Sequence, residues 1–207
     1  NYAAAAKSLA AQGKPELLGD SLAALSAQAL RAADIVGRIR RWVRQHPETR
    51  EPCDLHAAVD QSLALLLRAE ARRHGVPVRL ERAREPVCVS ADRVLLEQVV
   101  LNLGLTALQA MQSHAAAAHS PELLLRTAAD AGQASLQVLD RGPGLPPEVA
   151  ERLFEPFFTT RSDGLGLGLN ICRSIVESMG GALLARNRDG GGAIFEIRLP
   201  LAPATTP

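Results

Sequence analysis

The sequence predicts an α+β protein, with a two-helix hairpin followed by an α/β sandwich that has a mixed sheet and helices on one face. Two observations support this prediction. Within residues 16–45, apolar side chains recur every three or four positions along a narrow seam, as in a helix packed in a bundle. After residue 53, helical patterns alternate with pairs of strand patterns, which is typical of helices that cover one face of a mixed sheet.

The N-terminal part has the pattern of a helical hairpin. Residues 1–12 resemble the end of a helix, Gly13-Lys14-Pro15 interrupts it, and a second helix is expected over 16–45. Two such helices cannot bury their seam alone, so we expect a four-helix bundle in a homodimer. Packing of the second helix on the rest of its own chain is the alternative.

The remaining sequence divides at its proline-rich and charged segments. HPETREPC, with two prolines and three charged side chains, is typical of a linker. The predicted divisions are a hairpin at 1–46, a linker at 47–53, a domain at 54–201 and a tail at 202–207. Within the domain, helices are expected near 55–73, 91–111, 146–154 and 168–179, and strands near 76–82, 87–90, 122–128, 134–140, 182–187 and 193–200. Ser90 is the expected N-cap of the helix at 91–111.

Composition excludes several classes of function. A net charge of +1 does not indicate a nucleic-acid or anionic membrane surface. We expect no signal peptide and no membrane-spanning segment, because no continuous apolar run approaches the roughly 18–20 residues that a membrane-spanning segment needs. Cys53, Cys88 and Cys172 are far apart and the five histidines do not cluster, so the sequence predicts reduced thiols in a cytoplasmic protein rather than disulfides or a metal centre.

An aspartate ends the predicted strand at 134–140 and is followed by two glycines. The strand holds the Asp140 carboxylate in place, while Gly142 and Gly144 let a ligand approach the backbone closely. A carboxylate is a suitable hydrogen-bond acceptor for an exocyclic amine such as that of adenine. The pattern is weak by itself, because many β-turns look alike.

Three further glycines precede the apolar helix expected at 168–179. Gly164, Gly166 and Gly168 leave backbone N–H groups and the positive end of a helix free to bind phosphate. The run is not a P-loop, because no Gly-Lys-Ser/Thr follows, and it is not a Rossmann fingerprint, because no strand precedes it directly. A flexible loop without a ligand is the alternative interpretation.

Two more segments contribute polar or basic side chains. On the helix at 91–111, Asn102, Thr106 and Gln109 follow one another at helical spacing among leucines and valines. Buried polar groups need partners, so we expect this polar line to face a ligand. In EPFFTTR, the two phenylalanines are expected to anchor a loop, and Arg161 is expected either to reach a phosphate or to be solvated.

Taken together and in this order, the motifs resemble those of sensor histidine kinases of two-component systems. LEQVVLNLGLTALQAM resembles the N box of that family, DRGPGLP the first glycine box, LFEPFFTTR the F box and DGLGLGLNICRSIVESMGG the second glycine box. GGGAIFEIRLP is similar to the usual closing strand. The resemblance implies a Bergerat-type ATP-binding fold, and the NYA at the start implies that the phosphoacceptor histidine lies upstream of Asn1.

The resemblance also implies an activity and a set of site residues. The domain would bind ATP with Mg²⁺ and transfer the γ-phosphoryl group to the upstream histidine, from which an aspartate of a response regulator would receive it. The chain would form a cytoplasmic homodimer. It would belong to a longer parent protein, which can be anchored in a membrane. No catalytic residue is expected within the chain, and the implied ATP-binding residues are Asn102, Thr106, Asp140, Gly142, Gly144, Thr160, Arg161, Gly164, Gly166, Leu167 and Gly168.

One residue departs from the family pattern. The N box of the family has two asparagines four positions apart; the first matches Asn102, and the second, a Mg²⁺ ligand, falls at Thr106. A threonine hydroxyl is shorter than an amide, so we expect weaker metal binding and slow phosphotransfer. Two alternatives follow: a nucleotide-binding dimeric regulatory module with little turnover, and an ATPase of the wider Bergerat superfamily, against which the EPFFTTR segment and the hairpin argue.

Overall fold

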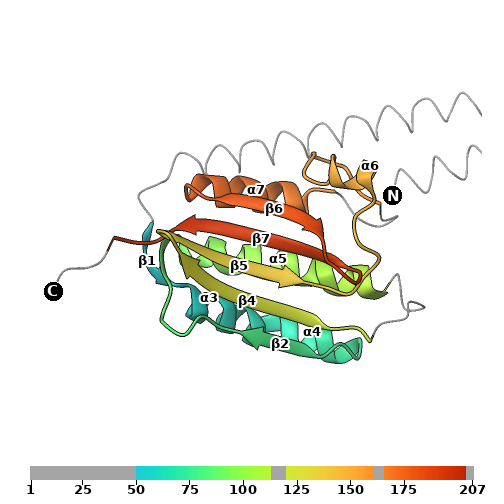
Figure 1. The fold of residues 1–207 in the computed structure, drawn as a ribbon, viewed down its shortest axis with the longest axis horizontal. Coiled ribbons are helices and arrows are strands. Elements are labelled where there is room, and N and C mark those ends of the chain that lie inside the picture. Colours follow the sequence, from blue (N-terminus) through green and yellow to red (C-terminus); the bar gives the residue numbers. More distant parts are fainter. Residues whose placement is uncertain (1–49, 113–119, 161–165, 204–207) are drawn as a thin grey trace, which may run out of the picture. The chain divides into compact units, whose positions relative to one another are not determined.

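The structure is a computed structural model that describes residues 50–112, 120–160 and 166–203 (Figure 1). The chain divides into two compact units, Asn1–Gln45 and His46–Pro207. The predicted hairpin and its four-helix bundle lie outside the described residues, as do residues 204–207. The description below therefore concerns the second unit.

The second unit alternates helices with strands, as the sequence predicted. Its helical segments are α3 (Leu55–Ser62), the π-helical η2 (Leu63–Leu67), α4 (Arg68–Arg73), α5 (Arg93–Gln112), α6 (Pro147–Ala150) and α7 (Gly168–Ser178). Its strands are β1 (Glu51–Asp54), β2 (Val78–Glu81), β3 (Cys88–Ala91), β4 (Leu123–Asp130), β5 (Gln133–Leu139), β6 (Ala182–Asn187) and β7 (Ala193–Pro200).

The sheet is mixed and has its helices on one face. Five strands follow the order β2-β4-β5-β7-β6, in which β2 pairs with β4 in parallel and the other neighbours are antiparallel. Helices α3, α5 and α7 lie along the same side of this sheet (Figure 1). The predicted α+β sandwich is therefore confirmed.

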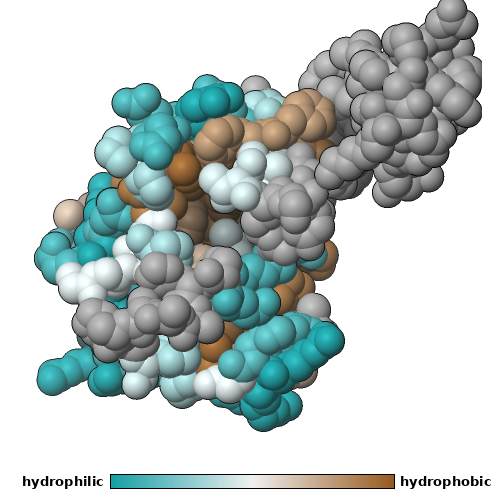
Figure 2. Space-filling model, turned by 90° about the vertical axis from the view of Figure 1, so that its right-hand side faces the viewer, coloured by the Kyte–Doolittle hydropathy of each residue, from teal (hydrophilic) through white to brown (hydrophobic). Residues whose placement is uncertain are grey.

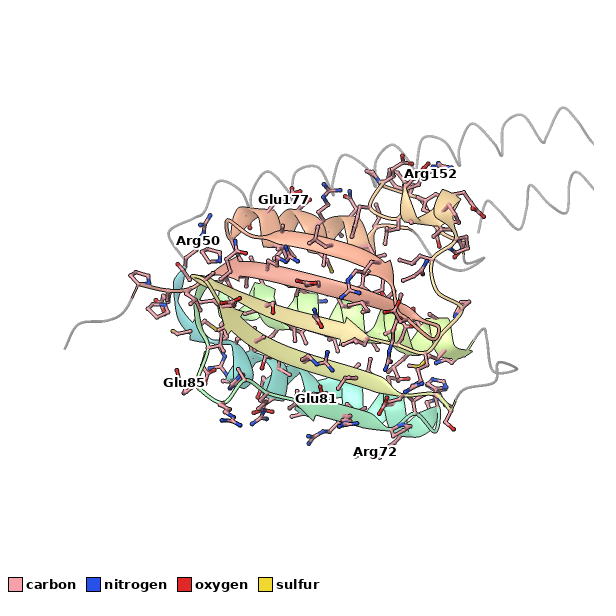
Figure 3. The ribbon with its side chains drawn as sticks, viewed as in Figure 1. Arg50, Arg72, Glu81, Glu85, Arg152 and Glu177 are labelled. Carbon is pink, nitrogen blue, oxygen red and sulfur yellow. The ribbon has the colours of Figure 1, made fainter. Side chains whose placement is uncertain are left out.

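The core lies between the sheet and these helices. Alternate residues of each strand face the helices, so Leu125 of β4, Val138 of β5 and Ile197 of β7 are buried. The opposite face of the sheet is largely polar: Glu81 accepts a hydrogen bond of 2.7 Å from Arg126 Nε and forms an ion pair with Arg79 at 3.1 Å (Figure 3). This alternation explains why the helices cover only one face.

The predicted linker and tail are both shorter than expected. Residues 51–54, assigned mainly to the linker, form β1, which pairs antiparallel with β3 in a separate two-stranded sheet. Pro52 lies within this strand, as a proline can in a two-stranded sheet, because each strand there has one open edge. At the other end, the N–H of Ala202 donates to the Cys88 carbonyl at 2.9 Å, so the first tail residue is held against β3.

Several helix boundaries also differ from the predictions. Asp92, not Ser90, caps α5: its Oδ1 accepts a hydrogen bond of 3.1 Å from the N–H of Leu95, while Ser90 belongs to β3. The helix predicted at 146–154 is only the four residues of α6, because turns follow it.

Helix α5 is also long and apolar enough to cross a membrane by length and composition, a property that the search for continuous apolar runs missed. Of the most apolar 18-residue window, 44% is buried within the domain. Core helices pass the same test, and the buried side chains of α5 face the sheet and the neighbouring helices.

Candidate functional site

Asp140 directly follows β5, and its carboxylate is almost entirely buried, with the residue 1% exposed. The oxygen Oδ1 accepts two backbone hydrogen bonds, from the N–H of Gly142 at 2.7 Å and from the N–H of Ala193 at 3.1 Å. The other oxygen, Oδ2, is buried and has no hydrogen-bond partner among the described residues. Burial raises the pKa of Asp140, and the two N–H donors and the Arg188 charge oppose that rise.

A buried carboxylate oxygen without a donor is costly, by about 1–3 kcal/mol or more for a charged group. Native structures retain such a group where a water or a ligand supplies the missing donor. The ionised Oδ2 can accept a hydrogen bond but offers no hydrogen, so the ligand group that fits it is a donor, either an amine or amide N–H or a hydroxyl. The sequence-based expectation of an exocyclic amine is consistent with this geometry.

The backbone around Asp140 is packed too closely for larger residues. A Cβ on Gly142 would lie 3.0 Å from Asp140 Oδ1 and 3.3 Å from the backbone of Ala110 on α5. Gly192, in the turn directly before β7, has a φ of +95°, and a Cβ there would lie 2.1 Å from the Asp140 carbonyl oxygen. Glycine at 192 therefore permits both the backbone conformation and the close approach of β7 to Asp140.

The N-box residues on α5 make hydrogen bonds within the protein. Thr106 Oγ1 donates to the carbonyl of Asn102 at 2.8 Å, one turn earlier. Asn102 Oδ1 accepts a hydrogen bond of 3.3 Å from Gln98 Nε2, and the Asn102 side chain also hydrogen-bonds the thiol of Cys172 on α7. Burial raises the pKa of Cys172 to about 12, so this thiol stays protonated.

The polar line on α5 was expected to face a ligand because buried polar groups need partners. The structure supplies Asn102 with partners on α5 and α7, so that reasoning does not by itself require a ligand at Asn102. Ala110, one turn after Thr106, lies beside Gly142, which places the C-terminal half of α5 along the first glycine loop, residues 141–145.

The turn at residues 154–158, here called the aromatic turn, meets the second glycine segment closely. The N–H of Phe157 donates to the carbonyl of Gly166 at 3.0 Å. A Cβ on Gly166 would lie 2.5 Å from the backbone carbon of Phe157, and both residues have a φ of +65°. A positive φ is uncommon for a phenylalanine, and such strained backbone is concentrated at functional sites.

Two side-chain contacts hold the aromatic turn against its surroundings. Asn170 Nδ2, on α7, donates to the carbonyl of Phe154 at 2.7 Å. The guanidinium of Arg152 lies 4.6 Å from the centre of the Phe158 ring, a cation–π contact (Figure 3). The anchoring role predicted for the two phenylalanines is thus seen for Phe158, whereas Phe157 is 44% exposed.

The remaining predicted residues of this segment lie between the aromatic turn and α7. Thr160 is exposed, Leu167 is half-buried, and Gly168 is the exposed first residue of α7. Among the described residues no side chain caps α7 at Leu167, so within that part of the chain no side-chain acceptor meets the N–H groups of its first turn. Arg161 and Gly164 lie outside the described residues.

The first glycine loop, the aromatic turn and the start of α7 lie at one end of the domain, where β5 ends and β7 begins (Figure 1). Figure 2 looks onto this end and shows apolar residues within a hollow, which is bordered by both hydrophilic and apolar residues. A hollow that contains apolar residues and a few fixed polar groups has the general character of a small-molecule site.

A cavity of about 240 Å³ lies elsewhere, beside the two-stranded sheet formed by β1 and β3. Cys53, Asp54 and Arg93 are among its lining residues, and none of the sequence motifs contributes a glycine or aspartate to it. Burial raises the pKa of the Cys53 thiol, and the neighbouring Arg93 opposes this effect. The cavity is therefore separate from the site at Asp140.

Sequence reasoning missed residues that hold the first glycine loop in place. Asn187, at the end of β6, hydrogen-bonds both the N–H and the carbonyl of Leu145. Ala193 supplies the backbone N–H to Asp140, and Gly192 allows its approach. The run of three glycines at 190–192, all with positive φ, was the available sequence signal, because it marks a tight turn beside a strand end.

A protein-family model described as "Histidine kinase-, DNA gyrase B-, and HSP90-like ATPase" matches residues 91–203, which include Asp140 and both glycine segments. The chain belongs to this family. Its relatives include sensor proteins: the C4-dicarboxylate transport sensor protein DctS of Rhodobacter capsulatus is 36% identical over 214 residues, and the sensor protein FixL of Bradyrhizobium diazoefficiens is 38% identical over 176 residues. The sensor histidine kinase TmoS of Ectopseudomonas mendocina is 30% identical over 183 residues. The predicted resemblance to sensor histidine kinases is confirmed.

Coverage shows which part of such a kinase the chain represents. The match spans all of this chain but 31% of DctS, and 84% of this chain but 34% of FixL. Among solved structures, the catalytic domain of histidine kinase ThkA superposes with a TM-score of 0.64 at 28% identity, covering 73% of this chain and 95% of that domain. The domain described here is thus a histidine kinase ATP-binding domain, and the chain spans about a third of these relatives.

Proposed function

We propose that this chain is the ATP-binding catalytic core of a sensor histidine kinase, which transfers the γ-phosphoryl group of ATP to a histidine upstream of Asn1. The observation that carries the proposal is Asp140 Oδ2, a buried acceptor with no partner among the described residues, at the end of the domain where the glycine segments meet. The exocyclic amine of adenine supplies the N–H donor that this oxygen lacks.

The proposed roles of the other residues follow from their positions. Gly142 and Gly144 line the base, because neither carries a side chain that would exclude it. The N–H groups that begin α7 at Gly168, together with Gly166 and Leu167, would face the phosphates. For Gly164 the same role is proposed from the sequence resemblance alone. Thr160 would add a hydroxyl at the same end, and a phosphate contact of Arg161 is proposed from the sequence resemblance alone.

In phosphotransfer, a nitrogen of the acceptor imidazole would attack the γ-phosphorus while the bond to the bridging oxygen of ADP breaks. Because the proposed acceptor histidine lies upstream of Asn1, the chain would contribute positioning and charge neutralisation rather than a nucleophile. The proposed assembly is a cytoplasmic homodimer through the hairpin at 1–46, and the proposed recipient is an aspartate of a response regulator.

Mg²⁺, when bound between protein and phosphates, would neutralise phosphate charge. The proposed ligands are Asn102 and Thr106, but both already hydrogen-bond within the protein, and a hydroxyl reaches less far than the amide of an asparagine. We therefore propose that metal binding is weak and phosphotransfer slow.

The hydrogen bonds that Asn102 and Thr106 make within the protein favour a second candidate function. With weak metal binding and no acceptor histidine, the domain would bind nucleotide without appreciable turnover and act as a regulatory module within a dimer. In this candidate the part of the site at Asp140 binds the base as in the kinase. The two candidates differ only in whether the residues on α5 bind the metal.

Nucleotide titration of the 207-residue chain, with and without Mg²⁺, tests the shared part of both candidates. Phosphotransfer to a separately supplied helical hairpin that bears the acceptor histidine then separates them. Binding with transfer supports the kinase, binding without transfer supports the regulatory module, and a folded chain that does not bind ATP contradicts both.

A further inference from the structure

Asn187, the last residue of β6, holds Leu145 through both of its backbone groups. Its Oδ1 accepts a hydrogen bond of 2.6 Å from the Leu145 N–H, and its Nδ2 donates to the Leu145 carbonyl at 2.9 Å. One side-chain amide thus pairs with Leu145 as the backbone of a neighbouring strand would. The two residues are 42 positions apart, so this contact joins the first glycine loop to the β6–β7 hairpin.

The same hairpin holds the other end of the loop. Asn187 pairs with Ala193 in the register of β6 and β7, and the N–H of Ala193 donates to Asp140 Oδ1. Arg188, the next residue along the chain, donates from Nη1 to the Asp140 carbonyl at 3.4 Å. The loop is therefore fixed at Asp140 and at Leu145 by adjacent residues of one hairpin.

The fit between the loop and Asn187 leaves little free space. A Cβ on Gly144 would lie 2.8 Å from Asn187 Oδ1 and 3.4 Å from the Gly192 carbonyl oxygen. A loop held this closely cannot shift toward β6, and the two hydrogen bonds oppose a shift away from it.

We propose that Asn187 is a positioning residue for nucleotide binding, which sets the distance between the first glycine loop and Asp140 Oδ2 and so selects the base. This inference rests on the proposed function. An acceptor discriminates between an amine and a carbonyl only if the base is held against it, because a loose pocket allows water to take the place of either. Adenine presents an amine to Oδ2, whereas guanine at the corresponding position presents a carbonyl oxygen that a carboxylate repels.

Calorimetric titration of the full chain with ATP and with GTP tests this inference. In Asn187→Ala we expect the Kd for ATP to rise about tenfold, in line with the loss of two hydrogen bonds, and the ratio of GTP to ATP dissociation constants to shrink. The matched control is Arg186→Ala, a change at an exposed neighbour on β6 whose side chain has no partner among the described residues; it should leave both values unchanged.

Two features separate positioning from a general loss of stability. Partial unfolding lowers the apparent affinity for ATP and GTP by the same factor, so it cannot change their ratio. Hydrogen exchange gives an independent measurement: Asn187→Ala should speed exchange of the Leu145 N–H while the Gly142 N–H, held by Asp140, stays protected.

The outcomes distinguish this inference from the proposed function. If the parent chain binds ATP, if Asp140→Asn weakens that binding, and if Asn187→Ala keeps both the affinity and the ratio of the parent chain, the role of Asn187 is wrong and the proposed function stands. If the folded parent chain does not bind ATP, the proposed function fails and the inference fails with it.

Discussion

The N–H of Ala193 donates to Asp140 Oδ1 at 3.1 Å, although 53 positions separate the two residues. Ala193 is the first residue of β7, and Asp140 directly follows β5, the strand that β7 pairs with. The antiparallel pairing of these strands therefore brings a backbone donor to the carboxylate and leaves Oδ2 as its free acceptor. The central sheet thus determines the orientation of the one buried carboxylate at this site.

Asp140→Asn should separate binding from stability. An asparagine can keep its oxygen in the Oδ1 position, where it accepts from Gly142 and Ala193, and then presents an NH₂ group where Oδ2 was. That group cannot accept an N–H from the base, so the affinity for ATP should fall roughly a hundredfold, about the effect of leaving a buried polar group unpaired. The free energy of unfolding without nucleotide should not fall, since no buried charge remains. Calorimetry and chemical denaturation measure the two quantities, and a variant that binds ATP like the parent would refute the role of Asp140.

The raised pKa of Asp140 predicts two opposite dependences on pH. Burial raises the pKa above its ordinary 3.8, so between the unfolded and folded values the native state binds more protons, and the contribution of this group to stability falls as pH rises through that window. Nucleotide binding needs the ionised acceptor, so affinity should fall as pH falls through the same folded pKa. Both effects should be absent from Asp140→Asn, so the difference between the parent chain and this variant should change with pH across the window. A difference that stays constant across the window would contradict both effects.

Two glycines of one turn provide a matched test of the approach of β7 to Asp140. Gly192 and Gly190 both have positive φ, +95° and +82°, but only at Gly192 would a Cβ meet an atom within 4 Å, the Asp140 carbonyl oxygen at 2.1 Å. Gly190→Ala should cost only the backbone penalty, about 1–2 kcal/mol, whereas Gly192→Ala should cost several kcal/mol more and abolish ATP binding. Denaturation with urea measures the free energy of unfolding of both variants. Equal losses of this free energy would show that the close approach of Gly192 to Asp140 is not important.

The β6–β7 hairpin could be predicted from the sequence because the patterns that indicate it are local. β6 and β7 begin and end at the predicted residues, since alternating apolar residues flank a glycine-rich turn. Asp140 was found for the same reason, as a polar residue at the end of an apolar strand. Local patterns of this kind need no knowledge of the neighbouring elements.

Features that depend on a distant partner were missed or misplaced. β1 has four residues and contains a proline, so it is recognisable only through its pairing with β3. Asn102 was expected to need a ligand, whereas a cysteine 70 positions later on α7 already supplies one of its partners. Asn187 and Leu145 lie in segments that nothing in the local pattern joins. In each case the deciding contact is long-range, and spacing along the chain does not show it.

Thr106→Asn should restore metal-dependent binding if Thr106 replaces a Mg²⁺ ligand. An asparagine amide reaches further than the threonine hydroxyl, which now donates to the Asn102 carbonyl within its own helix. We expect the ratio of ATP affinities with and without Mg²⁺ to rise about tenfold, and phosphotransfer to a supplied histidine-bearing hairpin to become faster. Thr106→Val is the control, because it keeps the shape of threonine and removes the hydroxyl. Equal Mg²⁺ dependence in all three chains would exclude position 106 from the metal site.

Gly166→Ala should disrupt the contact between the second glycine segment and the aromatic turn. Gly166 has a φ of +65°, and a Cβ there would lie 2.5 Å from the Phe157 backbone, which cannot yield as a flexible side chain does. The hydrogen bond from the Phe157 N–H to the Gly166 carbonyl should therefore be lost. ATP affinity should fall more than tenfold while most of the domain stays folded, because neither residue belongs to the sheet.

Gly168→Ala is the matched control for that change, since no atom lies within 4 Å of a Cβ at Gly168. Alanine favours a helix over glycine by up to about 1 kcal/mol, so this variant should be as stable as the parent chain or more stable. Its N–H is retained, so any loss of ATP affinity would report the close approach of phosphate to the Gly168 backbone. The pair thus distinguishes a glycine required by the fold from one required by the ligand. If Gly166→Ala bound ATP as well as Gly168→Ala does, the contact with Phe157 would have no part in forming the site.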